Sequence, residues 1–259
     1  MSTDAGRTVV YQSFRTSNVP AWMTACMESA KQWAQASGFE YRFYDDQFFG
    51  FCPPWYREQV SNHILLMSDL ARLVAGKALL DEGFERVIWV DADLLIFAPS
   101  AFKVHADTPF AFCRELWVGW ENGKFVGWPR VNNAVCTFAR GNSFLDFYID
   151  AAQRIVRQAL KLDPLSIGTT FLTGLHALMP IPQIQSVGTF NPILMDYLAQ
   201  GRLEPLSEYR TKFANPIAAA NLCGSFSGKT VQGVLMSEAI YAGAVSQLLG
   251  DPGRTISGK

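Results

Sequence analysis

The sequence predicts an α/β fold of one domain, in which a central, mostly parallel mixed sheet is flanked by helices. The chain opens with a strand at 8–12, a helix at 21–37 and a second strand at 39–44, an order typical of a parallel sheet. A long helix at about 61–82 then leads into an apolar strand at 87–90. With 259 residues, of which 49% are hydrophobic and 17% charged, the chain is expected to bury one large core.

Turn residues and hydrophobic periodicity mark the ends of the elements. Asn18 to Pro20 precede the first helix, Gly38 ends it, and Gly83 ends the long helix. Pro99 closes an apolar run at 94–97 that continues the strand before it. We further expect a loop or short irregular helix at 48–56, strands at 109–113 and 133–138, a Trp-rich loop at 117–129, helices at 144–162, 169–178 and 231–249, a segment at 191–200, loop structure at 203–229, and a polar tail at 250–259.

Charge and cysteine content exclude several classes of protein. The net charge is -1 and no basic run is present, so a dominant nucleic-acid surface is not expected. The five cysteines are odd in number and include no Cys-x-x-Cys pair, which predicts reduced, buried thiols. The start of the chain, 1–8, lacks the apolar core of a signal peptide, and no apolar run approaches the ~20 residues that span a bilayer. We therefore expect a cytoplasmic protein. Peripheral association with the inner face of the membrane stays open, as does the oligomeric state.

Two carboxylates, Asp91 and Asp93, interrupt the apolar stretch between Arg86 and Pro99. On an extended segment they project to the same side, about 7 Å apart at ~3.3 Å per residue. Two buried like charges repel each other unless a metal, an arginine or a raised pKa compensates them. Because carboxylate oxygens suit hard divalent cations, the pair is a candidate metal site.

Asp69 and Arg72 form a second informative pair, on the helix that precedes this strand. They share an apolar helix face with leucines and Gly76, on a helix that is hydrophobic nearly all round. One interpretation is a local ion pair, which contributes only a few tenths of a kcal/mol if exposed. The other is that Arg72 neutralises Asp91 while Asp69 meets a polar ligand.

The ordered series 68–73, 80–84 and 87–93 resembles the Asp-x-x-Arg, Gly and Asp-x-Asp series of retaining GT-A glycosyltransferases. The most similar groups are the glycogenin and lipopolysaccharide galactosyltransferase family, and the family of yeast initiating mannosyltransferases and clostridial toxin glucosyltransferases. Near the start of the chain, the short runs 10–14, 20–22, 38–42 and 45–46 are similar to the opening of the second group. The resemblance covers about residues 8–140. It implies a GT-A (Rossmann-like) domain with a nucleotide-sugar-binding half at about 8–98 and an acceptor-side half at about 99–249.

The resemblance also implies roles for these residues. Asp69 contacts the nucleoside or the sugar, and Arg72 orients the sugar or the first carboxylate. Asp91 binds the ribose or the donor sugar, Asp93 ligates Mn²⁺ or Mg²⁺ directly, and the segment Tyr11, Gln12 and Ser13 lies over the base. Such a cation would bridge the two phosphates of a nucleoside diphosphate sugar and stabilise the leaving diphosphate.

Further along the chain the resemblance is looser. Asn132 and Asn133 resemble an Asn-containing strand that contacts the donor sugar, although an Asn pair in a turn is an alternative. Thr173 and Gly174 are similar to a Thr-Gly-Pro element near the reaction centre, with Leu175 in place of Pro. His176, which follows, either reaches an acceptor hydroxyl or is structural.

Near the C-terminus these families supply a His as a further metal or phosphate ligand. This chain has none there, so Asn221, Ser225 or water takes that place. Gly224, Ser225 and Lys229 fit a small phosphate-facing loop, and an ordinary Gly-rich loop is the alternative.

The function expected from these observations is metal-dependent, retaining transfer of a hexose from a nucleoside diphosphate sugar to a glycan or glycolipid hydroxyl. UDP-sugars are favoured as donors and GDP-mannose is second. Retention follows from the resemblance alone, and no dedicated carboxylate base is evident. The alternatives are a phosphohydrolase of the haloacid dehalogenase kind and a non-catalytic relative that binds a nucleotide sugar. Trp117, Trp120 and Trp128 either form an aromatic platform for a sugar or lipid acceptor or fold onto neighbouring apolar residues.

Overall fold

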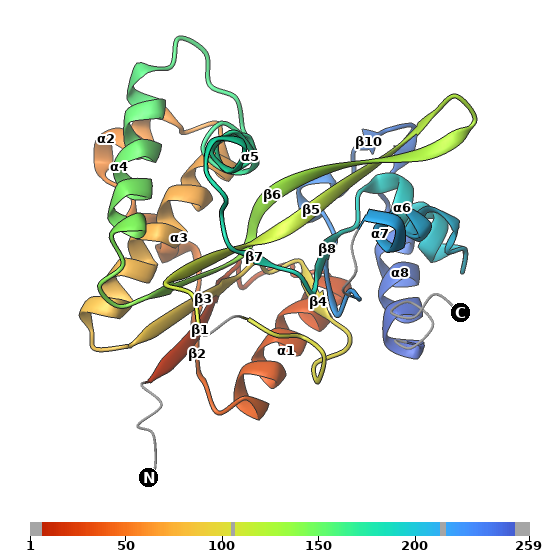
Figure 1. Ribbon diagram of the computed structural model, residues 1–259, viewed down its shortest axis with the longest axis horizontal. Coiled ribbons are helices and arrows are strands. Elements are labelled where there is room, and N and C mark those ends of the chain that lie inside the picture. Colours follow the sequence, from red (N-terminus) through yellow and green to blue (C-terminus); the bar gives the residue numbers. More distant parts are fainter. Residues whose placement is uncertain (1–6, 105–106, 213–215, 252–259) are drawn as a thin grey trace.

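A six-stranded sheet runs through the middle of the molecule in the computed structural model, which describes residues 7–104, 107–212 and 216–251 (Figure 1). Its strands lie in the order β2-β1-β3-β6-β5-β7, and of these β6 alone runs against the others. They are β1 (Thr8–Ser13), β2 (Glu40–Tyr44), β3 (Arg86–Val90), β5 (Phe110–Glu121), β6 (Lys124–Ala139) and β7 (Gln183–Ile184). The sheet is thus mixed and mostly parallel, and the predicted fold class is confirmed.

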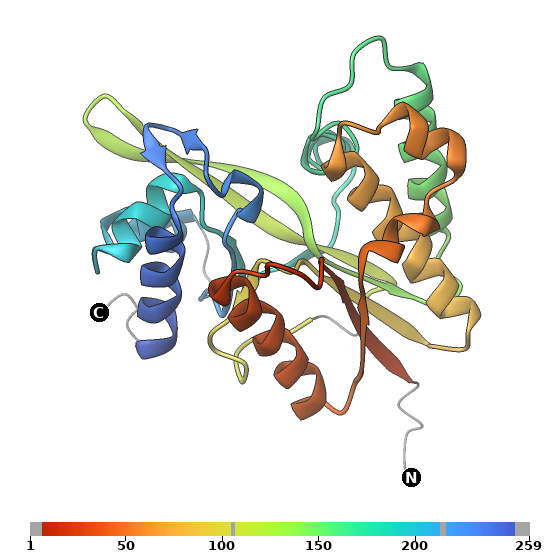
Figure 2. The same ribbon diagram turned by 180° about the vertical axis from the view of Figure 1, so that it is seen from behind.

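Helices cover both faces of the sheet because its strands are apolar on both sides. Val10 and Ile88 join one hydrophobic cluster with α1 (Ala21–Ala36), while Val9 and Val87 join another with α3 (Ile64–Asp81). The α4 helix (Ser143–Gln158) packs beside α3, and the two views place both helices on the same side of the sheet (Figures 1 and 2). The other helices are α2 (Pro54–Gln59), α5 (Thr169–Leu178), α6 (Pro192–Ala199), α7 (Ser207–Lys212) and α8 (Glu238–Gly250), with 3-10 turns at Asp46–Phe51, Glu204–Leu206 and Gly224–Phe226.

A long β-hairpin replaces the Trp-rich loop predicted at 117–129. β5 and β6 stay paired up to Glu121 and Lys124, and Asn122 and Gly123 form the tight turn with φ of 50° and 79°. Asn-Gly favours this left-handed pair of conformations, which matches the twist of the two strands. The hairpin extends beyond the main sheet and passes α6 (Figure 1). The predicted strands at 109–113 and 133–138 are the inner ends of these longer strands.

The apolar run at 94–97 does not continue the preceding strand. The chain turns after β3, where the Leu94 N–H donates to the Asp91 carbonyl at 3.1 Å. The next strand, β4 (Leu94–Ile96), enters a separate sheet of order β4-β9-β8, with β8 (Val187–Thr189) and β9 (Ala219–Asn221). The prediction of one interrupted strand was wrong, because the pairing partner of β4 lies more than a hundred residues further along the chain.

Other boundaries also differ from the predictions. The last helix begins at Glu238 rather than 231, because β10 (Thr230–Val231) and β11 (Val234–Leu235) form a small hairpin with left-handed Gln232 and Gly233. The helix expected at 144–162 ends at Gln158, and the region expected as loop at 203–229 contains α7 and β9. The helix at 169–178 has the predicted bounds, while the predicted tail lies largely outside the described residues.

All five cysteines are buried and free, which confirms the prediction of reduced thiols. Within the described ranges, we find no helix with the length and hydropathy needed to cross a bilayer.

Candidate functional site

A cavity of about 710 Å³ lies where β1 and β3 end. Its wall combines residues from both strand ends, from α3, from the β5/β6 hairpin and from the loop at 223–227. The carboxyl ends of parallel strands are where ligands bind in open α/β sheets. Its volume also falls in the range of small-molecule sites, about 300–1,000 Å³.

Asp91 and Asp93 stand together at this end of β3. A single amide joins them, since Asn221 Nδ2 lies 2.9 Å from Asp93 Oδ1 and 3.4 Å from Asp91 Oδ2. The Gly224 N–H also donates to Asp93 Oδ2 at 2.6 Å, which ties the loop before α8 to the carboxylate. The two acids therefore converge through a turn of the backbone and not, as predicted, through alternation along one strand.

Burial raises the pKa of both carboxyl groups. For Asp91, burial raises the pKa most, the Arg72 guanidinium lowers it and the neighbouring Asp93 raises it further, with a raised pKa as the net result. Burial likewise raises the pKa of Asp93, against the lowering effect of the Gly224 N–H and the Asn221 amide. The ion pairs and hydrogen bonds present do not fully compensate two buried negative charges, so a bound cation would be stabilised here.

Arg72 supports Asp91 from α3. Its Nη1 lies 3.0 Å from Asp91 Oδ1 and its Nη2 lies 3.1 Å from Asp69 Oδ1. The guanidinium also lies over the Trp89 ring, whose Nε1 donates to Asp91 Oδ1 at 2.6 Å. Arg72 is 4% exposed and Asp69 7%, which excludes the interpretation as a local surface pair. The predicted ion pair between Arg72 and Asp91 is present.

Asp69 connects α3 to β6. The Asn133 Nδ2 donates to Asp69 Oδ1 at 2.9 Å, and the Asn133 carbonyl accepts from Arg72 Nη1 at 2.9 Å. The pairing of β5 with β6 shifts register between Phe112 and Cys113, opposite this part of β6. Such irregularities re-aim side chains, and here both Asn132 and Asn133 line the cavity.

The structure brings together most of the predicted site residues. The cavity wall includes Ser13, Asp69, Arg72, Asp91, Asp93, Asn132, Asn133, Asn221 and Ser225. Five others lie elsewhere, and three of these have structural contacts that explain why. Tyr11 is fully buried and donates to the Arg72 carbonyl at 2.7 Å, and Gln12 donates to the Asp91 carbonyl at 3.1 Å. Thr173 bonds to the Val131 backbone and holds α5 against β6.

Gly174 and Lys229 complete the set that lies outside the cavity wall. Gly174 is an exposed residue of α5 with open space around it. Lys229 is exposed and its Nζ donates to the Ser225 carbonyl at 2.9 Å. His176 accepts from the Ile181 N–H at 3.0 Å through Nδ1, which accords with a structural role.

Glu115 and Arg130 line the cavity and were not predicted. They face each other across the hairpin, with Arg130 Nη1 3.2 Å from Glu115 Oε1. Glu115 is 3% exposed, and burial raises its pKa although Arg130 and Asn132 lower it. The sequence contained enough information to predict this pair. An Asn-Gly turn at 122–123 places residue 121 opposite residue 124, and the same register continued along both strands places residue 115 opposite residue 130.

The donor set fits a divalent cation of the kind that substrate phosphates also ligate. Mg²⁺ is usually held by one or two carboxylates plus phosphates and waters, and Asp91 and Asp93 supply two carboxylates. The Asn221 NH₂ group donates to both carboxylates, so an oxygen of each acid faces the same point. The Asn221 Oδ1 accepts from the Cys223 N–H at 2.9 Å, so its predicted role as a ligand requires the amide to turn. Among the residues described, no third Asp, Glu, His or Cys joins the pair.

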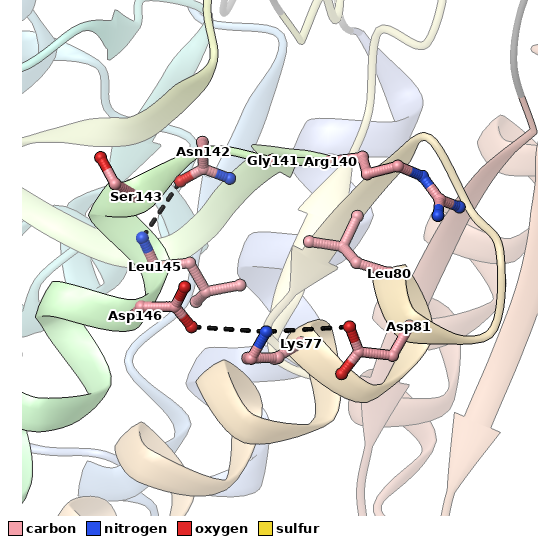
Figure 3. Close-up of a pocket in the computed structure, with 9 residues that line it drawn as sticks. All are labelled: Lys77, Leu80, Asp81, Arg140, Gly141, Asn142, Ser143, Leu145 and Asp146. Carbon is pink, nitrogen blue, oxygen red and sulfur yellow. Dashed lines mark hydrogen bonds and ion pairs between the residues drawn. The ribbon is translucent and has the colours of Figure 1, made fainter.

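Figure 3 shows a second, smaller pocket of about 230 Å³ between the end of α3 and the start of α4. Lys77 bridges Asp81 and Asp146 there, with Nζ 3.7 Å and 3.4 Å from their carboxylates. Both acids and the lysine are substantially exposed, and the pocket lies toward the opposite end of β3 from Asp91. This pocket is therefore formed around an exposed cluster of ion pairs, and none of the three charged groups is buried.

No protein-family model matches the sequence, and no curated protein matches it either. Among solved structures, a glycosyltransferase involved in glycosylation of the major capsid of PBCV-1 aligns with a TM-score of 0.42 and 9% identity, over 84% of this chain and 94% of that one. A197 from STIV aligns with a TM-score of 0.30 and 11% identity, over 66% and 78%. Similarity this low carries no argument about activity, which we base on the site itself.

Proposed function

We propose that this chain is a metal-dependent glycosyltransferase that moves a hexose from a nucleoside diphosphate sugar to a hydroxyl of a glycan or glycolipid. The observation that carries the proposal is the convergence of Asp91, Asp93 and Asn221 in a cavity at the carboxyl end of β3. The buried Arg72 and Asp69 stand beside them. A phosphate-bound dication at two carboxylates explains why two acids with raised pKa values share one site.

Each residue has a task in this proposal. Asp93 and Asp91 hold the cation, which would act as a Lewis acid that stabilises the departing diphosphate. Arg72 orients Asp91 through a charge-assisted hydrogen bond and keeps that carboxylate in place when the cation is absent. Asp69 and Asn133 present a carboxylate and an amide to hydroxyl groups of the donor sugar, since both are in the cavity wall.

The base and the ribose are assigned to the part of the cavity that contains Ser13, Phe14 and Phe49, whose rings are only partly buried. Aromatic rings in that region suit stacking against a nucleobase. The acceptor is assigned to the side of the cavity near Glu115 and the hairpin. Retention of the anomeric configuration follows from the sequence resemblance and is tested by NMR of the product.

The proposal predicts metal-dependent binding of a nucleotide sugar that requires Asp93. We would titrate UDP-glucose, UDP-galactose and GDP-mannose into the wild type, with and without Mn²⁺, by calorimetry. The Asp93→Asn variant is expected to bind about 100-fold more weakly in Mn²⁺, because it loses a charged ligand. Asp150→Asn removes an exposed carboxylate on α4 and serves as the matched control.

Two results would contradict the proposal. One is equal binding by the wild type and the Asp93→Asn variant. The other is absence of binding for all three donors in Mn²⁺. Mg²⁺-dependent hydrolysis of p-nitrophenyl phosphate in that second case would favour the phosphohydrolase alternative.

A further inference from the structure

We propose that Trp117 and Trp128 form a stacking platform for a saccharide unit of the acceptor, on the cavity-facing side of the β5/β6 hairpin. The inference rests on the proposed function and adds the class of acceptor and its subsite. It also separates these two residues from Trp120, which the sequence grouped with them.

The register of the hairpin determines which tryptophans share a face. Trp117 lies directly opposite Trp128, and Glu115 lies directly opposite Arg130. Because strand side chains alternate, all four project from the same side of the hairpin. The cavity wall contains Glu115, Trp117 and Arg130, so this side faces the candidate site.

The opposite side of the hairpin is packed against other elements. Leu116 and Val118 are fully buried there, and the Asn191 side chain donates to the Val118 carbonyl at 2.6 Å. Trp120 belongs to this side and packs edge-on against Phe125, with ring centroids 4.6 Å apart. Trp120 is therefore a tryptophan on the same hairpin that faces away from the cavity.

The absence of a side chain at position 119 lets Trp128 lie flat on the hairpin. A Cβ built on Gly119 would lie 2.7 Å from Cζ3 and 2.9 Å from Cη2 of Trp128, so the six-membered ring covers this glycine. Trp128 is still 39% exposed, which leaves the other ring face open. Neither Trp117 nor Trp128 uses its indole N–H in a hydrogen bond within the described part of the chain.

Trp117 connects the platform to the carboxylate end of the cavity. Trp117 packs edge-on to Phe226 at 6.2 Å between centroids, and Phe226 belongs to the same short turn as Gly224, whose N–H bonds Asp93. Glu115 and Arg130 provide a buried carboxylate and a guanidinium next to the rings. A flat apolar surface, free N–H groups and a charged pair together match a pyranose, which has an apolar C–H face and a rim of hydroxyls.

The tip of the hairpin argues against a lipid surface as the occupant. The tip residues, 121–124, are Glu-Asn-Gly-Lys and all are exposed. A segment that inserts into a membrane interface carries apolar residues at its leading edge. Trp117 lies in the cavity wall, and Trp128 lies opposite it on the same strand face, where a soluble sugar chain would reach both.

Saturation-transfer NMR with methyl glycosides tests the platform directly. The probes are the methyl α- and β-pyranosides of glucose, galactose and mannose, added to the wild type with Mn²⁺ and UDP. We expect saturation of the C–H protons of at least one glycoside, and a signal about tenfold weaker in Trp128→Ala. Trp128→Phe is expected to restore most of the signal, because it retains a flat ring. Trp120→Ala is the matched control and should behave as the wild type.

Gly119→Ala supplies a second test that keeps every atom of the platform. The added methyl group must displace the Trp128 ring, so the NMR signal should fall as in Trp128→Ala while the thermal unfolding midpoint stays within a few degrees. No transfer to any glycoside in the wild type, or equal transfer in Trp128→Ala, would overturn the inference. So would binding to phosphatidylglycerol vesicles that Trp128→Ala abolishes, since that result assigns the rings to a lipid.

Donor binding distinguishes a failure of the platform from a failure of the proposed function. If calorimetry shows metal-dependent nucleotide-sugar binding but the platform variants change nothing, the platform alone is wrong. If the wild type binds no nucleotide sugar, the proposed function fails whatever the glycosides do.

Discussion

At the scale of single residues, Arg72 is the side chain on which the candidate site depends most. It makes ion pairs with Asp69 and Asp91, donates to the Asn133 carbonyl and lies over Trp89. It thus connects α3, β3 and β6 at one point. Burial raises the pKa of Asp69 even with the Arg72 guanidinium beside it. The charged forms of Asp69 and Asp91 therefore depend on their ion pairs with Arg72.

We expect Arg72→Leu to lower the free energy of unfolding by about 3–5 kcal/mol at pH 8, because it leaves two buried carboxylates uncompensated. The loss should be smaller at pH 5. Without Arg72 the folded-state pKa of Asp69 rises further above its unfolded value, so the variant loses stability as the pH rises. Urea unfolding at both pH values measures the difference.

The control for this prediction is Arg154→Leu, which breaks an exposed ion pair with Asp150 on α4. A change of only about 0–1 kcal/mol is expected there. An equally small effect of Arg72→Leu would show that the buried carboxylates of Asp69 and Asp91 do not need the Arg72 guanidinium for stability.

At the scale of elements, the packing of α3 on β1 explains why Tyr11 lies outside the cavity. Gly76, in the middle of α3, allows the Tyr11 hydroxyl to reach the Arg72 carbonyl at 2.7 Å. A Cβ on Gly76 would lie 2.6 Å from the Tyr11 hydroxyl oxygen. Sequence spacing placed Tyr11 near the end of β1 and hence near the ligand, but side-chain alternation directs it under α3.

Gly76→Ala is therefore expected to destabilise the protein by about 1–3 kcal/mol through overpacking, although alanine is the better helix former. Combining it with Tyr11→Phe removes the clashing oxygen. The double variant should be at least about 1 kcal/mol more stable than the sum of the two single effects predicts. Denaturant unfolding of the four proteins gives this coupling.

Gly174→Ala in α5 is the matched control, since nothing lies within 4 Å of its added Cβ. It should be neutral or stabilising by up to about 1 kcal/mol. If the effects of Gly76→Ala and Tyr11→Phe on the free energy of unfolding were strictly additive, the close approach of the Tyr11 hydroxyl to position 76 would have no energetic consequence.

At the scale of the whole molecule, both hydrophobic clusters contain cysteines. Cys26 belongs to the cluster around α1, and Cys52 and Cys136 to the cluster around α3. Burial raises the pKa of every cysteine thiol, to about 12 for Cys52 and Cys113. At pH 8 the thiols are therefore protonated as well as inaccessible, and the thiolate is the reactive form.

The native chain should consequently show no fast reaction with 5,5′-dithiobis(2-nitrobenzoate) at pH 8. In urea, all five thiols should become reactive over the range in which circular dichroism reports loss of helices. Ser17→Cys adds an exposed thiol and should react at once with one equivalent. Reaction of a native thiol well below the unfolding transition would reveal local opening of one of the clusters.

The sequence alone determined the α/β class, the strand–helix–strand opening, the helix at 169–178 and the Asp69, Arg72, Asp91 and Asp93 set. These depend on local periodicity and on charged residues in apolar segments, which are properties of short stretches of chain. The Asn-Gly turn was equally local, and it would have predicted the hairpin and the Glu115–Arg130 pair.

Only the tertiary structure decided how distant segments meet. The resemblance had named Asn221 as one candidate for the further ligand, but the contact itself depends on the pairing of β9 with β4, which no local pattern in either strand specifies. Tyr11 is excluded from the cavity because Gly76, more than sixty residues later, makes room for its hydroxyl. Such contacts depend on the packing of whole elements, which is a property of the complete chain and not of any segment.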